Sequence, residues 1–223
     1  MKHGITLLLL LLQLTVAQAM RLEVVGNQVF AEGAVGGNDF NLIQAAFDNP
    51  KVDTVVFVNS PGGDLWTGRM IGYLIAEKKY KTVVAGYCMS ACSVMFVAGR
   101  ERRFGDALGP NQNVIGIHGS HDRRMKQVMR AQQQELFDFY KNMIGEKFNA
   151  AIITQALYFM DDTTGMLFIW ETHRARQAIP FQCPSAKTPR TSCTYYKEET
   201  ALTLGVLTHE DLAVIELPAA FKK

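Results

Sequence analysis

The sequence lacks a marked excess of charge of either sign. Its 223 residues include 23 Lys and Arg against 21 Asp and Glu, a formal net charge of +2 at pH 7. Proteins that bind nucleic-acid phosphates need a concentrated basic surface. The one basic cluster near the central motifs, Arg100, Arg102 and Arg103 with Glu101 among them, is typical of a solvated strand edge. The composition therefore argues against a nucleic-acid partner.

An internal repeat, a low-complexity tract and a domain linker are also lacking. The apolar run at residues 5–12 is interrupted only by Thr6 and is too short to span a bilayer comfortably. It follows a short basic start and precedes small residues at Ala17 and Ala19, the pattern of a cleaved secretory signal; a retained anchor is the alternative. We predict cleavage after Ala19, a single domain over residues 20–223, and a periplasmic or secreted location.

Cysteine is scarce, with four residues in the chain. In an exported protein these are expected to form disulfides, and four cysteines allow three pairings. Cys183 and Cys193 enclose a loop rich in Pro, Ser and Thr, and we predict a bridge between them. Cys88 and Cys92 lie four residues apart, and two interpretations stay open: a bridge, or two small buried hydrophobic side chains.

Apolar periodicity predicts strands and helices in alternation. Residues 21–33 are expected to form a hairpin, and Asn38 is expected to cap a helix that runs to Asp48. An α/β layer is the architecture that such an order predicts. The further predicted elements are a strand at 52–58, a helix at 65–79, and strands at 82–85, 102–104 and 113–119.

Ser90 lies where a predicted strand turns into a predicted helix. Residues 81–85 form a β-branched run, and residues 86–99 continue as an apolar segment long enough for a short buried helix. At such a turn a hydroxyl stands clear of the backbone, and the free N–H groups of the first helical turn point toward developing charge. This is the geometry of an acyl-transfer nucleophile. The alternative is that Ser90 only caps the helix.

A second stretch, residues 55–64, places a Pro-Gly-Gly turn between a hydrophobic strand and a helix. Gly62 and Gly63 permit backbone conformations and close approaches that a side chain would block. Their N–H groups can therefore line a pocket. Taken alone, the tripeptide is only a turn signal.

Together the two stretches resemble the Clp protease proteolytic subunit and its relatives in the Clp/crotonase superfamily, which include exported serine peptidases similar to signal-peptide peptidase. In that family a Ser-Pro-Gly-Gly turn precedes a Gly-x-x-x-Ser turn whose helix closes on an Ala-Gly pair. Gly86, Ser90, Ala98 and Gly99 match that spacing without a gap. The resemblance covers residues 24–208 and implies an α/β fold, a Clp/crotonase-like superhelix of repeated β-β-α units.

The resemblance also implies roles for site residues. The backbone N–H groups of Gly63 and Ala91 would stabilise an oxyanion. His118 ends the strand predicted at 113–119 and is the candidate general base, since a neutral imidazole can take the serine proton. His121 is its nearby competitor.

A metal site that uses His118, His121 and Asp122 is a weaker alternative, because nothing else in the chain supplies ligand spacing. A tetrathiolate zinc site is not expected either, since one cysteine pair lies in apolar sequence. We predict no metal and no cofactor.

Asp162 falls where Clp proteases carry the acid of the triad, and the adjacent Asp161 is the alternative. Adjacent aspartates in a turn are also commonly capping or solvated residues. The family pattern breaks soon afterwards. An inserted cysteine loop near residues 166–197 precedes the segment 199–208, where the resemblance resumes.

Residues 122–148 are predicted to form one long amphipathic helix. In the resembling enzymes this segment often makes subunit contacts, which favours a homo-oligomer; packing on the protein's own sheet is the simpler alternative. The N-terminal region has no evident ATPase-docking segment, and ATP is not expected outside the cytoplasmic membrane. We therefore expect no ATPase partner.

Three functions compete. The first is an exported, ATP-independent serine hydrolase, most simply a peptidase, with a triad of Ser90, His118 and Asp162. The second is a catalytically inactive Clp-like fold that binds peptides or a partner protein. The third is an acyl-thioester enzyme of the crotonase branch, which is discounted because coenzyme A is cytoplasmic and this chain is predicted to be exported.

Overall fold

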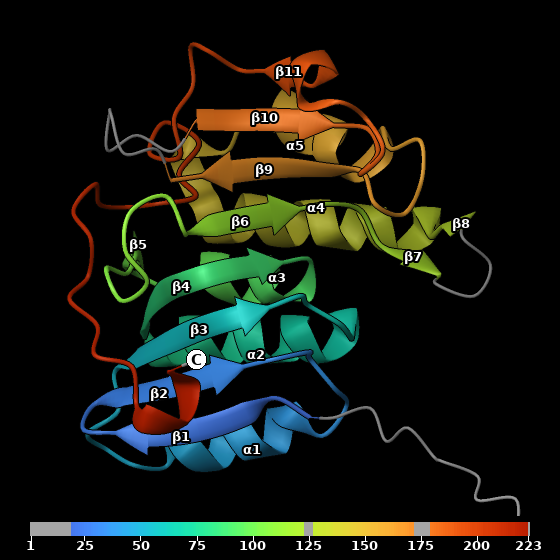
Figure 1. Cartoon of the computed structure of the whole chain (residues 1–223). Coiled ribbons are helices and arrows are strands. Elements are labelled where there is room, and N and C mark those ends of the chain that lie inside the picture. Colours follow the sequence, from blue (N-terminus) through green and yellow to red (C-terminus); the bar gives the residue numbers. More distant parts are fainter. Residues whose placement is uncertain (1–18, 123–126, 172–178, 223) are drawn as a thin grey trace, which may run out of the picture.

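The structure is a computed structural model, and it describes residues 19–122, 127–171 and 179–222. Within them one sheet has the strand order β1-β2-β3-β4-β6-β9-β10-β11, and β5 pairs with β4 outside this path. A second, two-stranded sheet joins β7 to β8 (Figure 1). The strands are β1 (Arg21–Val25), β2 (Gln28–Glu32), β3 (Thr54–Ser60), β4 (Lys81–Met89), β5 (Arg102–Phe104), β6 (Val114–Ile117), β7 (His121–Asp122), β8 (Gln127–Val128), β9 (Met166–Trp170), β10 (Ile179–Cys183) and β11 (Thr194–Tyr195).

Helices cover one face of the large sheet, and the C-terminal segment crosses the other face (Figure 1). None of the helices in the described residues is both long and apolar enough to cross a membrane. The α-helices are α1 (Asp39–Phe47), α2 (Leu65–Lys78), α3 (Ala91–Val97), α4 (Arg130–Ile144) and α5 (Ala150–Tyr158), and the short 3-10 helices are η1 (Gly145–Lys147), η2 (Arg190–Ser192) and η3 (Ala219–Phe221).

The central strands are buried on both faces, which explains their nearly continuous hydrophobic sequences. Side chains alternate between the faces of a strand. Val55 and Phe57 of β3 therefore belong to the core beneath the helices, whereas Val56 and Val58 belong to a second core. The C-terminal segment closes this second core with Ile215, Leu217 and Phe221.

β4 changes partner along its length, because its first half pairs in parallel with β5 and its second half in parallel with β6. Gly86 lies between the halves with a φ of +96°, and a Cβ there would lie 2.1 Å from the side-chain oxygen of Asn59. The buried Asn113 accepts a hydrogen bond from the Gly86 N–H at 2.9 Å and donates to the Gly105 carbonyl at 2.8 Å. The first glycine of the Gly-x-x-x-Ser motif is thus required by this bend in the strand.

The predicted helix over residues 122–148 is wrong in its first part. His121–Asp122 and Gln127–Val128 form β7 and β8, and α4 begins at Arg130. The Met129 N–H donates to the Ser120 carbonyl at 2.9 Å, so the residue just before α4 lies beside the residue just before β7. Apolar periodicity in this stretch did not reveal that reversal.

The apolar stripe of α4 packs inside the same chain. Leu136, Phe139 and Tyr140 are each 1% exposed, and all three belong to the core beneath the sheet. The simpler alternative, packing on the protein's own sheet, is the one observed. A homo-oligomer stays a prediction that rests on the family resemblance alone.

Asn38 occupies the N-cap position of α1, but its side chain makes no capping hydrogen bond. The following residue, Asp39, is fully buried, and its carboxylate accepts the Gly36 N–H at 2.6 Å. The predicted start of the helix is therefore correct, but the Asn38 side chain does not make the predicted capping bond. An aspartate in the first turn of a helix is normally a solvated charge, and only the fold shows that this one points inward.

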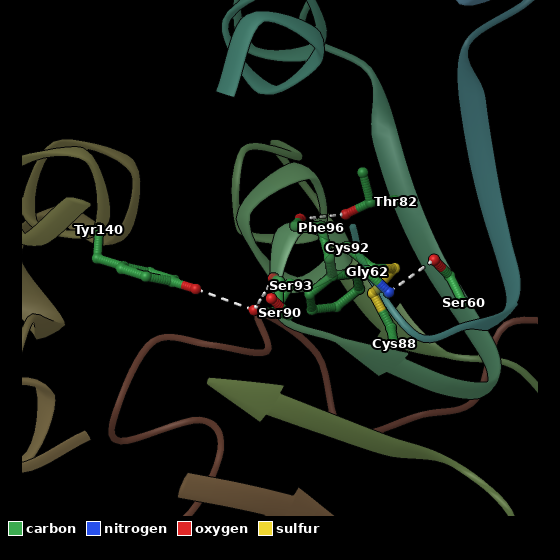
Figure 2. Close-up of a disulfide and its surroundings, with 9 residues drawn as sticks. All are labelled: Ser60, Gly62, Thr82, Cys88, Ser90, Cys92, Ser93, Phe96 and Tyr140. Carbon is green, nitrogen blue, oxygen red and sulfur yellow. Dashed lines mark hydrogen bonds between the residues drawn. A yellow bond between two sulfur atoms is a disulfide. The ribbon is translucent and has the colours of Figure 1, made fainter. Parts of the chain in front are cut away.

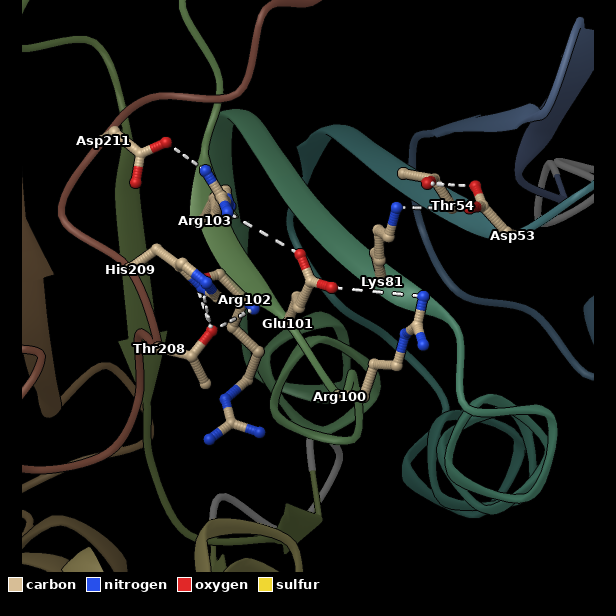
Figure 3. A network of polar contacts seen from close by, with 10 residues as sticks. All are labelled: Asp53, Thr54, Lys81, Arg100, Glu101, Arg102, Arg103, Thr208, His209 and Asp211. Carbon is tan, nitrogen blue, oxygen red and sulfur yellow. Dashed lines mark hydrogen bonds and ion pairs between the residues drawn. The ribbon is translucent and has the colours of Figure 1, made fainter.

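The basic cluster at residues 100–103 contains both surface and buried side chains. Figure 3 shows its polar contacts. Arg103 forms ion pairs with Glu101 and Asp211, and Arg100 pairs with Glu101, as expected of a solvated strand edge. Arg102 contradicts that expectation, because it is 7% exposed.

The Arg102 guanidinium donates to four backbone carbonyls, and burial lowers its pKa to about 10. Two acceptors lie at the carboxyl end of α3: Val97 is its last residue, and Gly99 lies two residues beyond it. The other two, Gly205 and Val206, lie more than 100 positions further along the sequence. A cation at the carboxyl end of a helix also interacts favourably with the helix dipole. Arg102 therefore joins α3 to the last part of the sequence.

The segment expected to be an inserted cysteine loop extends the sheet. It contributes β9, β10 and β11, each antiparallel to its neighbour, and residues 172–178 of the predicted insertion lie outside the described residues. Cys183 and Cys193 form a disulfide with their Cα atoms 4.6 Å apart, which is compatible with the predicted pair. Closing a loop of this size stabilises a fold by about 2–3 kcal/mol.

Candidate functional site

The parallel register of β3, β4 and β6 brings the candidate site residues to one edge of the sheet. Met89 at the end of β4 is opposite Gly116 of β6, and the Ser90 N–H donates to the Gly116 carbonyl at 2.9 Å. His118 follows the last residue of β6 directly. The carboxyl ends of parallel strands are where α/β sheets bind their ligands.

A cavity of about 840 Å³ opens at this edge. Ser90, His118 and Gly63 line it together. His121 lines it as well, with its ring centroid 5.1 Å from that of His118. The other residues around it include Val35, Gly36, Asp64, Trp66, Arg69, Ser120, Gln132, Glu135 and Leu136.

Ser90 has a backbone conformation that L-residues rarely adopt, with φ of +56° and ψ of −124°. It occupies the N-cap position of α3, yet its side chain makes no capping hydrogen bond, so the capping alternative is wrong. A non-glycine residue held in such a region costs on the order of 1–3 kcal/mol, and such outliers gather at functional sites. The turn places Ser90 at the cavity, at the N-terminus of a buried helix.

A disulfide closes over the Ser90 turn (Figure 2). Cys88 and Cys92 are bridged with their Cα atoms 5.2 Å apart, so of the two open interpretations the structure has the bridge. Both cysteines are fully buried. The bridge fixes the residues on each side of Ser90 and supports its strained conformation.

Ser93 holds the turn from the helix side (Figure 2). Its hydroxyl donates to the Ser90 carbonyl at 2.7 Å and lies 2.9 Å from the Tyr140 hydroxyl. Because the single Ser93 proton is used on Ser90, Tyr140 is the donor in the second bond. Tyr140 is fully buried, and burial raises its pKa, so it keeps its proton for this bond.

The Gly62–Gly63 turn lies directly against the Ser90 turn. A Cβ on Gly62 would come within 2.4 Å of the Met89 carbonyl oxygen and 2.6 Å of the Ser90 Cβ. A Cβ on Gly63, where φ is +154°, would lie 2.1 Å from the Val35 carbonyl oxygen. Only glycine fits either position, which is why two consecutive glycines occur here.

The predicted oxyanion donors lie on the two sides of this contact. Gly63 lines the cavity, and Ala91 is the first residue of α3, where a helical N–H has no acceptor within the helix. Ala91 is 1% exposed and is not among the residues that line the cavity. The placement of both N–H groups as oxyanion donors stays a prediction.

Gln133 supports the segment that follows His118, and sequence reasoning missed it. Its side chain accepts the Ser120 N–H at 3.0 Å and donates to the Ser120 carbonyl at 2.9 Å, although it is fully buried. A Cβ on Gly119 would lie 2.5 Å from the Gln133 amide nitrogen. The available signal was a polar residue on the apolar face of a helix, one turn before Leu136.

Asp162 lies in the turn between α5 and β9 and is not among the residues that line the cavity. Its carboxylate accepts hydrogen bonds from the Thr164 N–H at 2.8 Å, from the Thr164 hydroxyl and from the Ser185 hydroxyl at 2.7 Å. These bonds lower the pKa of Asp162 to about 2. The structure therefore brings Ser90 and His118 to one cavity and gives the Asp162 carboxylate other partners.

The Asp162 turn is expected to lose stability only at strongly acidic pH. Because its folded pKa of about 2 lies below the ordinary value of 3.8, ionised Asp162 stabilises the fold above 3.8, and this contribution is lost as the pH falls through about 2. The Tm difference between wild type and Asp162→Asn, followed by circular dichroism, should be constant above about pH 5 and should shrink below pH 3.8.

Asp161→Asn is the matched control, because no hydrogen bond among the described residues reaches its carboxylate; its Tm should stay near the wild-type value throughout. A difference for Asp162→Asn that stays unchanged down to pH 2 would contradict the assigned role of the carboxylate. A loss of turnover at neutral pH as large as that of His118→Ala would return Asp162 to the triad.

An ion pair between Arg69 of α2 and Glu135 of α4 lies at the cavity. Trp66, 64% exposed, stands beside it on α2, and Asp64 caps the same helix by accepting the Thr67 N–H at 2.7 Å. The side of the cavity formed by α2 thus offers an aromatic surface and paired charges. Sequence reasoning did not assign these residues to the site.

No group of three or more His, Cys, Asp or Glu side chains within the described residues is placed to hold a metal ion. His118, His121 and Asp122 are all described, so they do not assemble the alternative metal site.

The geometry defines an α/β protein with a strained serine, a glycine turn and a histidine at one sheet edge. The family model described as Clp protease matches residues 36–118. This stretch contains the glycine turn and Ser90, ends at His118, and stops short of Asp162.

Among solved structures, a mutant of ClpP1 from Listeria monocytogenes is similar over 88% of this chain and 95% of its own, with 16% identity and a TM-score of 0.50. A mutant of the 1510-N membrane-bound stomatin-specific protease is similar over 58% of this chain and 67% of its own, with 12% identity and a TM-score of 0.41. A comparison with curated protein sequences found no match. Over residues 36–118 the chain is similar to the Clp protease family, and its mixed α/β fold is similar to that of ClpP1, as the resemblance noted in the sequence predicted.

Proposed function

We propose that the protein is an exported, ATP-independent serine peptidase in which Ser90 is the nucleophile and His118 the general base. The observation that carries the proposal is the strained Ser90 at the start of α3, which faces the same cavity as His118 and Gly63. The match to the Clp protease family model over these residues supports a peptidase at the level of the family.

In the proposed reaction the Ser90 hydroxyl attacks the carbonyl carbon of a substrate peptide bond while His118 accepts its proton. The negative charge on the carbonyl oxygen is stabilised by the Gly63 and Ala91 N–H groups and by the N-terminal end of α3. His118 then protonates the leaving amine, and water hydrolyses the acyl-enzyme with His118 again as base.

The substrate is proposed to be a peptide or protein chain. The open cavity and the exposed Trp66 beside it provide contact area for a side chain of such a substrate. Assignment of Asp162 as the orienting acid rests on the resemblance only, since its carboxylate bonds to Thr164 and Ser185. Export after cleavage at Ala19 and a homo-oligomer are parts of the same proposal.

A fluorophosphonate probe tests the proposal on the purified protein that begins at Met20. We expect one label per chain, located by peptide mass spectrometry at Ser90, and no label in Ser90→Ala. Ser192→Ala, at an exposed serine in η2, is the control and should label as wild type does. A wild-type protein that neither labels nor cleaves a peptide or ester library would favour the non-hydrolytic binding function.

A further inference from the structure

Asp39 is a buried carboxylate without a counter-charge among the described residues. It is fully buried, and none of the ion pairs in the described part of the chain includes it. Its two oxygens accept one backbone N–H each, from Met20 at 3.0 Å and from Gly36 at 2.6 Å. A buried carboxylate with only neutral donors is costly to keep ionised, and burial raises the pKa of Asp39 accordingly.

The donor on one side of Asp39 is the residue that follows the predicted cleavage site. Met20 directly succeeds Ala19, its side chain is 3% exposed, and it belongs to the core beneath the helices. Terminal residues are usually poorly ordered unless something ties them down. Here both the side chain and the backbone nitrogen of the predicted first residue are held inside the fold.

The donor on the other side connects Asp39 to the candidate site. Gly36 lines the cavity, and the preceding Val35 forms a bridge with Gly63. The Val35 N–H donates to the Gly62 carbonyl at 2.9 Å, and the Val35 carbonyl accepts the Asp64 N–H at 2.9 Å. Asp39 therefore holds Gly36, and the adjacent Val35 pairs with the glycine turn that contains the predicted oxyanion donor Gly63.

We propose that Asp39 is a binding site for the α-ammonium group that cleavage after Ala19 creates on Met20, and that the resulting ion pair holds Val35 and Gly36 against the Gly62–Gly63 turn. Hydrolysis of the Ala19–Met20 bond consumes one water and leaves a carboxylate on Ala19 and an ammonium on Met20. The neutral amide N–H at this position is thereby replaced by a positive charge with three donors. Removal of the leader would thus supply the missing counter-charge and complete the site.

The inference rests on the predicted cleavage and, for its link to the oxyanion turn, on the proposed function. Its test compares two forms of the purified protein, one that begins at Met20 and one that retains Gln18 and Ala19. Both carry one terminal ammonium, so their net charges are equal and only its position differs. Each form is made with the native sequence, with Asp39→Asn and with Asp48→Asn, an exposed aspartate at the end of α1 that serves as matched control.

We expect the native form that begins at Met20 to melt at least roughly 5 °C above the form that retains Gln18 and Ala19, because breaking a buried ion pair has a large effect on a domain of this size. The difference should vanish in Asp39→Asn and persist in Asp48→Asn. The rate of fluorophosphonate labelling should fall about tenfold or more in the longer form, in parallel with the Tm, as expected when an oxyanion donor is displaced.

Equal melting temperatures for the two native forms would overturn the ammonium site, and this comparison holds even if Asp39→Asn does not fold. A Tm difference between the two forms that depends on Asp39, together with an unchanged labelling rate, would overturn the link to the glycine turn. The same Tm difference in a protein that never labels would support the ammonium site and count against the proposed hydrolase. An exported protein whose intact mass shows a start other than Met20 would also overturn the inference.

Discussion

Ser90→Ala is expected to remove most of the turnover, with a loss on the order of 10⁴-fold or more in kcat. The buried disulfide and the Ser93 hydroxyl hold the turn in place. We therefore expect no other side chain to move into the position of the Ser90 hydroxyl. His118→Ala is expected to cause a loss of similar size. The two losses should not add in the double variant, since in the proposed reaction both residues take part in the same proton transfer.

These losses are measured as initial rates on a peptide or ester substrate found with the wild-type protein. His121→Ala is the informative comparison, because its ring lies 5.1 Å from that of His118 and lines the same cavity. We expect a loss of less than about tenfold for His121→Ala; a loss as large as that of Ser90→Ala would make His121 the base. Full activity in Ser90→Ala would show that the nucleophile is a different residue.

Gly63→Ala is expected to lower kcat about 10²–10³-fold, the usual effect of losing one oxyanion donor. The added Cβ would lie 2.1 Å from the Val35 carbonyl oxygen and 2.9 Å from its nitrogen, so the bridge between Val35 and Gly63 has to open. The positive φ of +154° adds backbone strain. Because the change moves an N–H group and removes no side chain, KM should change less than kcat.

Gly37→Ala is the matched control for Gly63→Ala. It makes the same chemical change two residues from Val35, at a position where a Cβ meets no atom within 4 Å. Its kcat and Tm are expected to stay close to the wild-type values. If Gly63→Ala folded and kept full kcat, the Gly63 N–H would not be a donor to the oxyanion.

Much of the candidate site could be predicted because short stretches of consecutive residues determine its two turns. One stretch places a Pro-Gly-Gly turn after a strand, and the other places a serine between a strand and an apolar helix. The parallel register then places them together, since β3 and β4 pair with each other and β4 pairs with β6. His118 could be placed near them for the same reason, because it directly follows the last residue of β6.

The errors concern residues whose environment is set by distant parts of the chain. Arg102 was expected at a solvated edge, yet two of its acceptors, Gly205 and Val206, lie more than 100 positions away in the sequence. Asp162 matched a family position, but its carboxylate bonds to Ser185, 23 residues further along. The residues that neighbour Arg102 or Asp162 in the sequence do not indicate hydrogen-bond partners this far away. The start of α4 was misplaced because Met129 pairs with Ser120 across a reversal that periodicity does not show.

The buried Arg102 makes the helix that follows Ser90 depend on a distant part of the sequence. Ser90 stands at one end of α3, and at the other end Arg102 binds the carbonyls of Val97 and Gly99 together with those of Gly205 and Val206. A folding intermediate in which residues 205 and 206 are not yet docked leaves the Arg102 guanidinium with two of these four acceptors. A buried charge that lacks part of its partners is costly. The helix that begins beside Ser90 is therefore fully anchored only after the segment around residues 205–206 has folded against it.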